Sequence, residues 1–143
     1  MPVLFSRACE YAVRGLIVMA RNPEKESWRI PDIAKESETP SPFLAKTFQS
    51  LVRGGILHST KGRNGGFRFA RPVEEIALID VVEIIDGGRL THDCALGMPD
   101  CNDDNPCPFH TQWRRIRLPL IDALKQESLA RLAKGLKSKV LDT

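Results

Sequence analysis

The 143-residue sequence has no long apolar run and no secretory leader pattern. No segment approaches the roughly 20 consecutive apolar residues that a membrane-spanning helix requires. The N-terminus lacks a basic head followed by an apolar stretch and a small-residue cleavage site. We therefore expect a cytoplasmic protein with no membrane partner. Hydrophobic residues still make up 42% of the chain, which is enough for a real core, and the length suits one domain.

The sequence also lacks the common signatures of enzymes. It has no paired nucleophile and base, no Walker loop and no glycine fingerprint between a strand and a helix. Internal repeats and low-complexity linkers are absent as well. We therefore expect neither catalysis nor a small-molecule substrate.

Charge is unevenly distributed along the chain. Residues 1–72 hold 12 Lys and Arg against 6 Asp and Glu, whereas residues 73–110 hold 1 against 9. Residues 111–143 are basic again, with 8 against 3. The basic N-terminal region suits a polyanion such as DNA, while the acidic stretch at 100–104 is expected to be solvated.

Cysteine is scarce and clustered. Cys9 stands alone on an apolar helical segment, whereas Cys94, Cys101 and Cys107 lie within 14 residues. A cytosolic chain of this size does not need disulfides for stability. An odd group of three therefore indicates a metal or redox site, and Cys9 is expected to be a small buried residue.

Apolar spacing at i, i+3 and i+4 predicts three helices in the basic region, over 6–21, 30–37 and 41–53. Ser6 and Ser41 are the expected caps of the first and third helices. The second and third helices are short and joined by a tight turn. This is the pattern of a helix-turn-helix motif.

Two apolar runs follow, over 56–60 and 67–70, around a glycine-rich turn. They predict a β-hairpin, and a hairpin directly after a helix-turn-helix is a wing. A further helix over 76–86 is expected to pack on this unit. Residues 1–88 are thus predicted to form a winged helix-turn-helix DNA-binding domain.

The rest of the chain is predicted to be a cysteine loop over 89–108 and a helical unit over 109–143. The long helix of this helical unit, over 109–125, contains Pro119, where we expect a kink. A last short helix, capped by Ser128, carries an apolar stripe of Leu129, Leu132 and Leu136. An exposed amphipathic helix late in a short chain favours pairing with a second copy. The expected fold is mainly α with a small β-hairpin and a long C-terminal dimerisation helix.

The winged motif predicts which side chains meet DNA. The 41–53 helix would enter the major groove, and the wing would contact the backbone or the minor groove, where its glycines allow close approach. The alternative is a winged module used only for protein contacts. The candidate DNA-binding residues are Thr39, Ser41, Lys46, Thr47, Gln49, Arg53, Lys61, Arg63, Asn64, Gly65 and Arg68.

The cysteine loop has the spacing C-x6-C-x5-C-x2-H, ending at His110. Thiolates are the preferred ligands of iron–sulfur clusters, and histidine can replace one of them. Zinc accepts three cysteines and one histidine too, but these gaps are looser than paired C-x2-C knuckles, which favours a cluster. Reduced, unligated thiols are the alternative. His110 is either the fourth ligand or simply a residue of the first helical turn.

Three stretches resemble one bacterial family of winged-helix regulators. They are the opening from Phe5 to Arg14, the Ile30-x2-Ile33-Ala34 helix and the wing from Lys61 to Pro72. The family is typified by the iron–sulfur cluster regulator IscR, the nitric-oxide-sensing repressor NsrR and the rhizobial iron regulator RirA. The Ile79-Asp80-x-Val82 helix and the three-cysteine loop fit it too. Phe43-Leu44-Ala45-Lys46 departs from a Glu-Gln pair common in the iron–sulfur cluster regulators.

The resemblance implies a homodimer, crossed through the long helix, that binds palindromic promoter DNA. It implies that Cys94, Cys101 and Cys107 ligate a 2Fe–2S or 4Fe–4S cluster. The fourth ligand in the family is either a histidine after the third cysteine, here His110, or an acidic residue of the partner's first helix, here Glu10 of the partner subunit. Both remain candidates.

We therefore predict a transcription regulator, specifically a repressor, that senses iron, redox state or nitric oxide through a cluster. One alternative is a zinc-containing or thiol-switch repressor without a cluster. Another is an electron-transfer protein that carries the cluster for its own sake. The helix-turn-helix and wing argue against the latter, which has no use for them.

Overall fold

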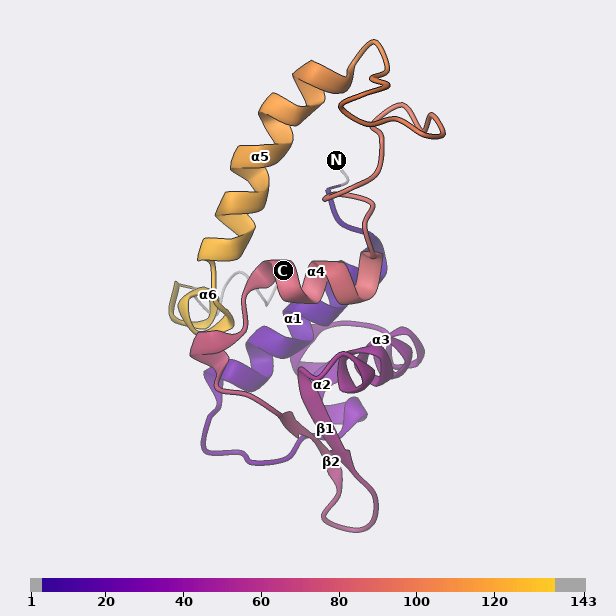
Figure 1. Ribbon diagram of the computed structural model, residues 1–143. Coiled ribbons are helices and arrows are strands. Elements are labelled where there is room, and N and C mark those ends of the chain that lie inside the picture. Colours follow the sequence, from indigo (N-terminus) through magenta and orange to yellow (C-terminus); the bar gives the residue numbers. More distant parts are fainter. Residues whose placement is uncertain (1–3, 136–143) are drawn as a thin grey trace.

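The computed structural model describes residues 4–135. Its secondary structure is mostly helical, with one antiparallel two-stranded sheet (Figure 1). The elements in chain order are α1 (Arg7–Arg21), α2 (Ile30–Ser37), α3 (Ser41–Arg53), β1 (Leu57–Thr60), β2 (Gly66–Phe69), the 3₁₀ helix η1 (Val73–Glu75), α4 (Leu78–Asp86), α5 (His110–Gln126) and α6 (Leu129–Gly135).

The predicted helices of the helix-turn-helix are confirmed. Helix α1 is capped as expected, because the Ser6 hydroxyl accepts a hydrogen bond from the backbone N–H of Cys9 at 3.1 Å. The predicted cap of α3 is wrong. Ser41 is the first helical residue, and the N-cap position belongs to Pro40, which makes no side-chain cap hydrogen bond.

Helix α1 lies at the centre of the winged domain, in contact with α2, α3, α4 and α6. Gly15 makes the approach of α3 possible, since a Cβ built there would lie 3.0 Å from the Phe48 ring. The fully buried Phe48 ring also meets Phe67 of β2 edge-on, with ring centroids 5.5 Å apart. One aromatic side chain thus joins the first helix, the third helix and the wing.

The two strands of the wing lie within one residue of their predicted boundaries, and Leu57 pairs with Phe69 and Thr60 with Gly66. Trp28 adds a third short segment, since its backbone exchanges two hydrogen bonds with Phe67 at 2.8 and 2.7 Å. A Cβ on Gly66 would lie 2.5 Å from the Trp28 carbonyl oxygen. This glycine therefore serves internal packing of the wing, whereas we expected the wing glycines to serve contact with phosphate.

The helix predicted from residue 76 begins two residues later, at Leu78. Ile76 is extended because its carbonyl accepts a hydrogen bond from the Leu129 N–H at 2.9 Å. The Leu78 N–H in turn donates to the Glu127 carbonyl at 2.7 Å. This bridge fixes the junction of α5 and α6 to the start of α4. Ser128 caps α6 as predicted, by accepting from the Arg131 N–H at 3.1 Å.

Helix α5 packs on α4, because its Leu120, Ile121 and Leu124 join Ile79 and Val82 in a second apolar cluster. The cysteine loop lies at the far end of α5 (Figure 1). Leu124 is the one buried residue of this helix, while Ile116 and Leu118 are 54% and 51% exposed. Pro119 lies inside the helix, and the kink expected there stays a prediction. Leu136 of the expected apolar stripe lies outside the described residues. In the part of the chain that the structure describes, no helix is long and apolar enough to cross a membrane.

Candidate metal centre and nucleic-acid interface

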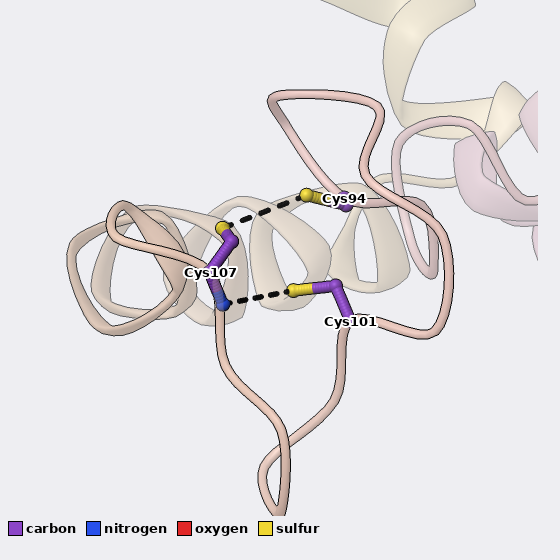
Figure 2. A group of neighbouring side chains, drawn as sticks. All are labelled: Cys94, Cys101 and Cys107. Carbon is purple, nitrogen blue, oxygen red and sulfur yellow. Dashed lines mark hydrogen bonds between the residues drawn. The ribbon is translucent and has the colours of Figure 1, made fainter.

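The three loop cysteines converge. Their Sγ atoms all lie within 4.8 Å of one another, and each residue is half-buried (Figure 2). The sulfurs of Cys94 and Cys107 lie 3.6 Å apart. Cys101 accepts a hydrogen bond from the Cys107 backbone N–H at 3.4 Å. A loop without regular structure therefore presents three soft donors to one point.

A tight polar turn brings the second and third cysteines together. The Asn102 side-chain oxygen accepts hydrogen bonds from the backbone N–H groups of Asp104 and Asn105, both at 2.9 Å. Asp100 adopts a left-handed conformation, with φ of 54°, and its carbonyl accepts from both asparagine side chains. Asparagine and aspartate favour such turns because their short polar side chains bond the local backbone.

The donor set suits a tetrahedral soft metal. Bond lengths of about 2.3 Å to sulfur and 2.1 Å to nitrogen place two donors on the same tetrahedral ion about 3.6–3.8 Å apart. The Cys94–Cys107 separation of 3.6 Å agrees with that value. Hydrogen bonding, first from the Met98 backbone, lowers the pKa of the Cys94 thiol to about 7. Deprotonation favours metal binding, since the thiolate is the ligand.

His110 lies beside this triad at the first position of α5. Its Nδ1 is 3.3 Å from the Cys101 sulfur, and its Nε2 is 2.8 Å from Asp103 Oδ1. Arg114 donates to the same carboxylate oxygen at 3.0 Å. These two partners, His110 first, lower the pKa of Asp103. Asp103 is exposed, as expected of the acidic stretch, but it is also paired with these two side chains. No pattern in the sequence indicates this contact.

A second arginine of α5 holds the start of the loop. Arg117 donates a hydrogen bond to the backbone carbonyl of Asp93, the residue before Cys94. Its guanidinium also lies 5.1 Å from the centre of the Trp113 ring. Sequence patterns did not single out this arginine. It ties the conformation of the loop directly to the long helix.

Cys9 and Glu10 lie on α1 and are not part of the triad within this chain. Cys9 is fully buried, as predicted, and burial raises the pKa of its thiol to about 12. Glu10 is exposed. Only a second subunit could therefore bring a Glu10 carboxylate to these cysteines if the described arrangement is kept.

Helix α3 exposes Ser41, Lys46, Gln49 and Arg53, four of the predicted DNA-contacting residues. Two threonines differ from the expectation. Thr39 is buried and its hydroxyl lies 2.8 Å from that of Ser37. Thr47 is buried and donates to the Leu44 carbonyl at 3.0 Å. Their hydroxyls serve the turn and the helix rather than an exposed face.

The wing exposes Lys61, Arg63, Asn64 and Arg68, all four predicted side chains. Gly65 is buried, and a Cβ there would lie 2.2 Å from the Thr60 carbonyl oxygen, so it closes the turn instead. Arg29 is a residue that the sequence analysis missed. From the start of α2, its guanidinium donates to the carbonyls of Gly62, at 3.0 Å, and of Arg63. The wing tip is thus tied to the helix-turn-helix.

Comparison with known proteins decides the family. The profile of the Rrf2 family, described as "Iron-dependent Transcriptional regulator", matches residues 5–135. The chain belongs to the Rrf2 family. A putative HTH-type transcriptional regulator of Aquifex aeolicus is 32% identical over 126 residues, which cover 86% of each chain.

Solved structures of this family share the fold. The cysteine regulator CymR of B. subtilis superposes with a TM-score of 0.77 at 18% identity, covering 95% of this chain and 100% of that one. IscR of T. potens gives a TM-score of 0.74 at 19% identity, covering 97% and 92%. The predicted family and winged-helix fold are therefore confirmed. The chain is a transcriptional regulator and, as predicted, not an enzyme.

Proposed function

We propose that this Rrf2 regulator represses transcription from the cytoplasm as a homodimer that binds palindromic promoter DNA and carries an iron–sulfur cluster, 2Fe–2S or 4Fe–4S. Cys94, Cys101 and Cys107 are its ligands, with His110 or Glu10 of the partner subunit as the fourth. The observation that carries the proposal is the convergence of three sulfurs within 4.8 Å beside a winged domain. The unit boundaries predicted at 88 and 108 are part of the same proposal.

Exposed basic and polar residues support the DNA-binding part. Lys46, Gln49 and Arg53 project from the recognition helix α3, and Lys61 and Arg63 project from the wing. Helix α3 in the major groove with the wing on the backbone or in the minor groove is the winged-helix mode of docking. Two copies would read two half-sites about one helical turn apart. The exposed Ile116 and Leu118 of α5 support pairing of copies through this helix.

A bound iron–sulfur cluster supplies a centre that reacts with oxidants or nitric oxide and is lost when iron is scarce. The protein's own contacts then link the loop to α5. Arg114 bonds Asp103, and Arg117 bonds the Asp93 carbonyl. Rearrangement of the loop must break or move both contacts. Because half-site spacing is a geometric requirement, a small shift of α5 in a dimer would change DNA affinity.

Anaerobic reconstitution with iron and sulfide tests this proposal. We expect a coloured protein whose visible absorption disappears in Cys94→Ala, Cys101→Ala and Cys107→Ala. Cys9→Ala is the matched control and should keep the colour, since Cys9 is buried elsewhere. A colourless wild-type protein with stoichiometric zinc would contradict the cluster. His110→Ala and Glu10→Ala spectra distinguish the two candidates for the fourth ligand.

DNA binding needs its own test. Binding to promoter DNA should weaken steeply as salt rises, because each phosphate contact releases counterions. Failure to bind promoter DNA in both the cluster-loaded and metal-free states would contradict the repressor function and favour an electron-transfer protein.

A thiol switch without a cluster is the second candidate. The 3.6 Å between the Cys94 and Cys107 sulfurs supports it, since little movement would join them in a disulfide. Mass spectrometry of the metal-free protein after mild peroxide treatment would detect this bond as a loss of two hydrogens. DNA binding that responds to peroxide in protein free of iron would favour this candidate.

A further inference from the structure

We propose that Asp103, itself held by Arg114, is a positioning residue that fixes the His110 ring so that Nδ1 is the fourth donor of the cysteine site. This inference rests on the proposed function, because it concerns a metal group on the same loop. It goes beyond that function by assigning roles to Asp103 and Arg114 and by favouring the subunit's own His110 over Glu10 of the partner subunit.

The orientation of the ring carries the argument. One imidazole nitrogen faces the cysteine site, with Nδ1 3.3 Å from the Cys101 sulfur. The other faces away, with Nε2 2.8 Å from Asp103 Oδ1. Nδ1 therefore faces the same point as the cysteine sulfurs and lies close enough to bind the same metal group as Cys101. The side chain is 21% exposed, which leaves it shielded but within reach of the site.

The carboxylate determines which nitrogen carries the hydrogen. A carboxylate can only accept hydrogen bonds, so Nε2 is the nitrogen that donates its N–H to Asp103 Oδ1. Nδ1 then keeps a free lone pair directed at the cysteines. Histidines that bind metals commonly donate their other N–H to a carboxylate, which fixes ring orientation and raises ligand basicity. The Asp103–His110 pair has this arrangement.

Arg114 makes the carboxylate a rigid partner. It lies one helical turn after His110 on α5 and donates to the same Oδ1 atom at 3.0 Å. The Asp103 side chain is 67% exposed. Without a second partner, an exposed side chain on a loop would be free to change rotamer. The arginine therefore connects the carboxylate to the helix that also carries the histidine.

Asp103→Ala tests the inference, with Asp104→Ala as its matched control. Asp104 is the adjacent exposed acid, and its carboxylate makes no hydrogen bond or ion pair in residues 4–135. After anaerobic reconstitution, we expect Asp103→Ala to lose iron to a chelator about 10-fold faster than wild type, since loss of such a partner costs about 10–100-fold in metal affinity. Asp104→Ala should match wild type.

Two further readouts separate positioning from general damage. In metal-free, ¹⁵N-labelled protein, long-range ¹H–¹⁵N spectra should show His110 protonated at Nε2 in wild type and in Asp104→Ala, and a mixture of tautomers in Asp103→Ala. In the loaded protein, the histidine-nitrogen coupling to the reduced cluster should be present in wild type and absent in His110→Ala. Adding Asp103→Ala to His110→Ala should not accelerate iron loss further, because Asp103 acts through His110.

Each result has a distinct meaning. Equal iron loss from the Asp103→Ala and Asp104→Ala proteins would overturn the inference, as would additive effects in the double variant. A wild-type cluster with no histidine-nitrogen coupling would also overturn it and would favour the partner's Glu10. A wild-type chain that binds no cluster would contradict the proposed function instead, and the tautomer measurement would still decide whether Asp103 orients His110.

Discussion

The winged domain and the cysteine loop of this protein are stabilised in different ways. In the winged domain, side chains such as Leu16, Phe48 and Trp28 are almost fully buried in one continuous apolar core. In the loop, Leu96 and Met98 are 53% and 47% exposed, and the conformation depends on hydrogen bonds. Segments with few buried apolar contacts open most easily. The difference places a well-packed winged domain beside a cysteine loop that can rearrange at low cost.

Thiol reactivity should give the largest contrast between the two regions. In metal-free protein, we expect iodoacetamide to alkylate Cys94, Cys101 and Cys107 at least about 10³-fold faster than Cys9, because Cys9 reacts only after unfolding. Burial raises the pKa of Cys9 to about 12, so its thiolate is scarce at any pH below that value. Peptide mass spectrometry measures the four rates. Comparable rates at Cys9 and the loop would contradict the well-packed winged domain.

The second-largest contrast should be in the free energy of unfolding, which substitutions in the winged domain should lower far more than substitutions in the loop. Phe48→Ala removes a ring that contacts both Gly15 and Phe67 and should lower the free energy of unfolding by about 3–5 kcal/mol. Cys101→Ala in the metal-free protein should change it by less than about 0.5 kcal/mol. Urea unfolding followed by circular dichroism measures both. A large effect of Cys101→Ala would mean that the loop supports the fold.

Arg63 and Arg29 should have smaller effects, confined to DNA binding. Arg63→Ala removes a candidate phosphate contact at the exposed wing tip and should lower the slope of log affinity against log salt by about 1. Arg29→Ala should weaken binding by about 3–10-fold with an unchanged slope, because its hydrogen bonds hold the wing-tip carbonyls. Fluorescence anisotropy over a salt series separates them. A reduced slope for Arg29→Ala would make Arg29 a DNA contact itself.

The elements that local patterns dictate were predictable from the sequence. Apolar spacing indicated the helices near their observed bounds, and the cysteine spacing indicated the triad. The exceptions depend on contacts between distant segments. The extended conformation of Ile76 comes from pairing with Leu129, some 50 residues later. The packing role of Gly66 depends on Trp28. Arg29 reaches the wing tip because the preceding residue, Trp28, pairs with Phe67 of β2.

Within the candidate site, residue type was enough to predict the metal donors. The side chains that hold these donors in place could be identified only in the structure. Asp103 is one of several acids in a polar stretch, and only the turn built on Asn102 brings its carboxylate back to His110. Arg114 and Arg117 are two of three arginines in one short segment, and the pattern does not say which loop atoms they meet. Side chains that support a site carry no signature of their own when they bond through loop closure.

The iron and acid-labile sulfide content of anaerobically isolated protein shows whether Cys94, Cys101 and Cys107 bind an iron–sulfur cluster. If the loop is a cluster site, wild type should contain at least two irons and two sulfides per chain, and Cys101→Ala should contain neither while keeping the fold. Fully folded protein that binds zinc or no metal and contains no sulfide would contradict the cluster.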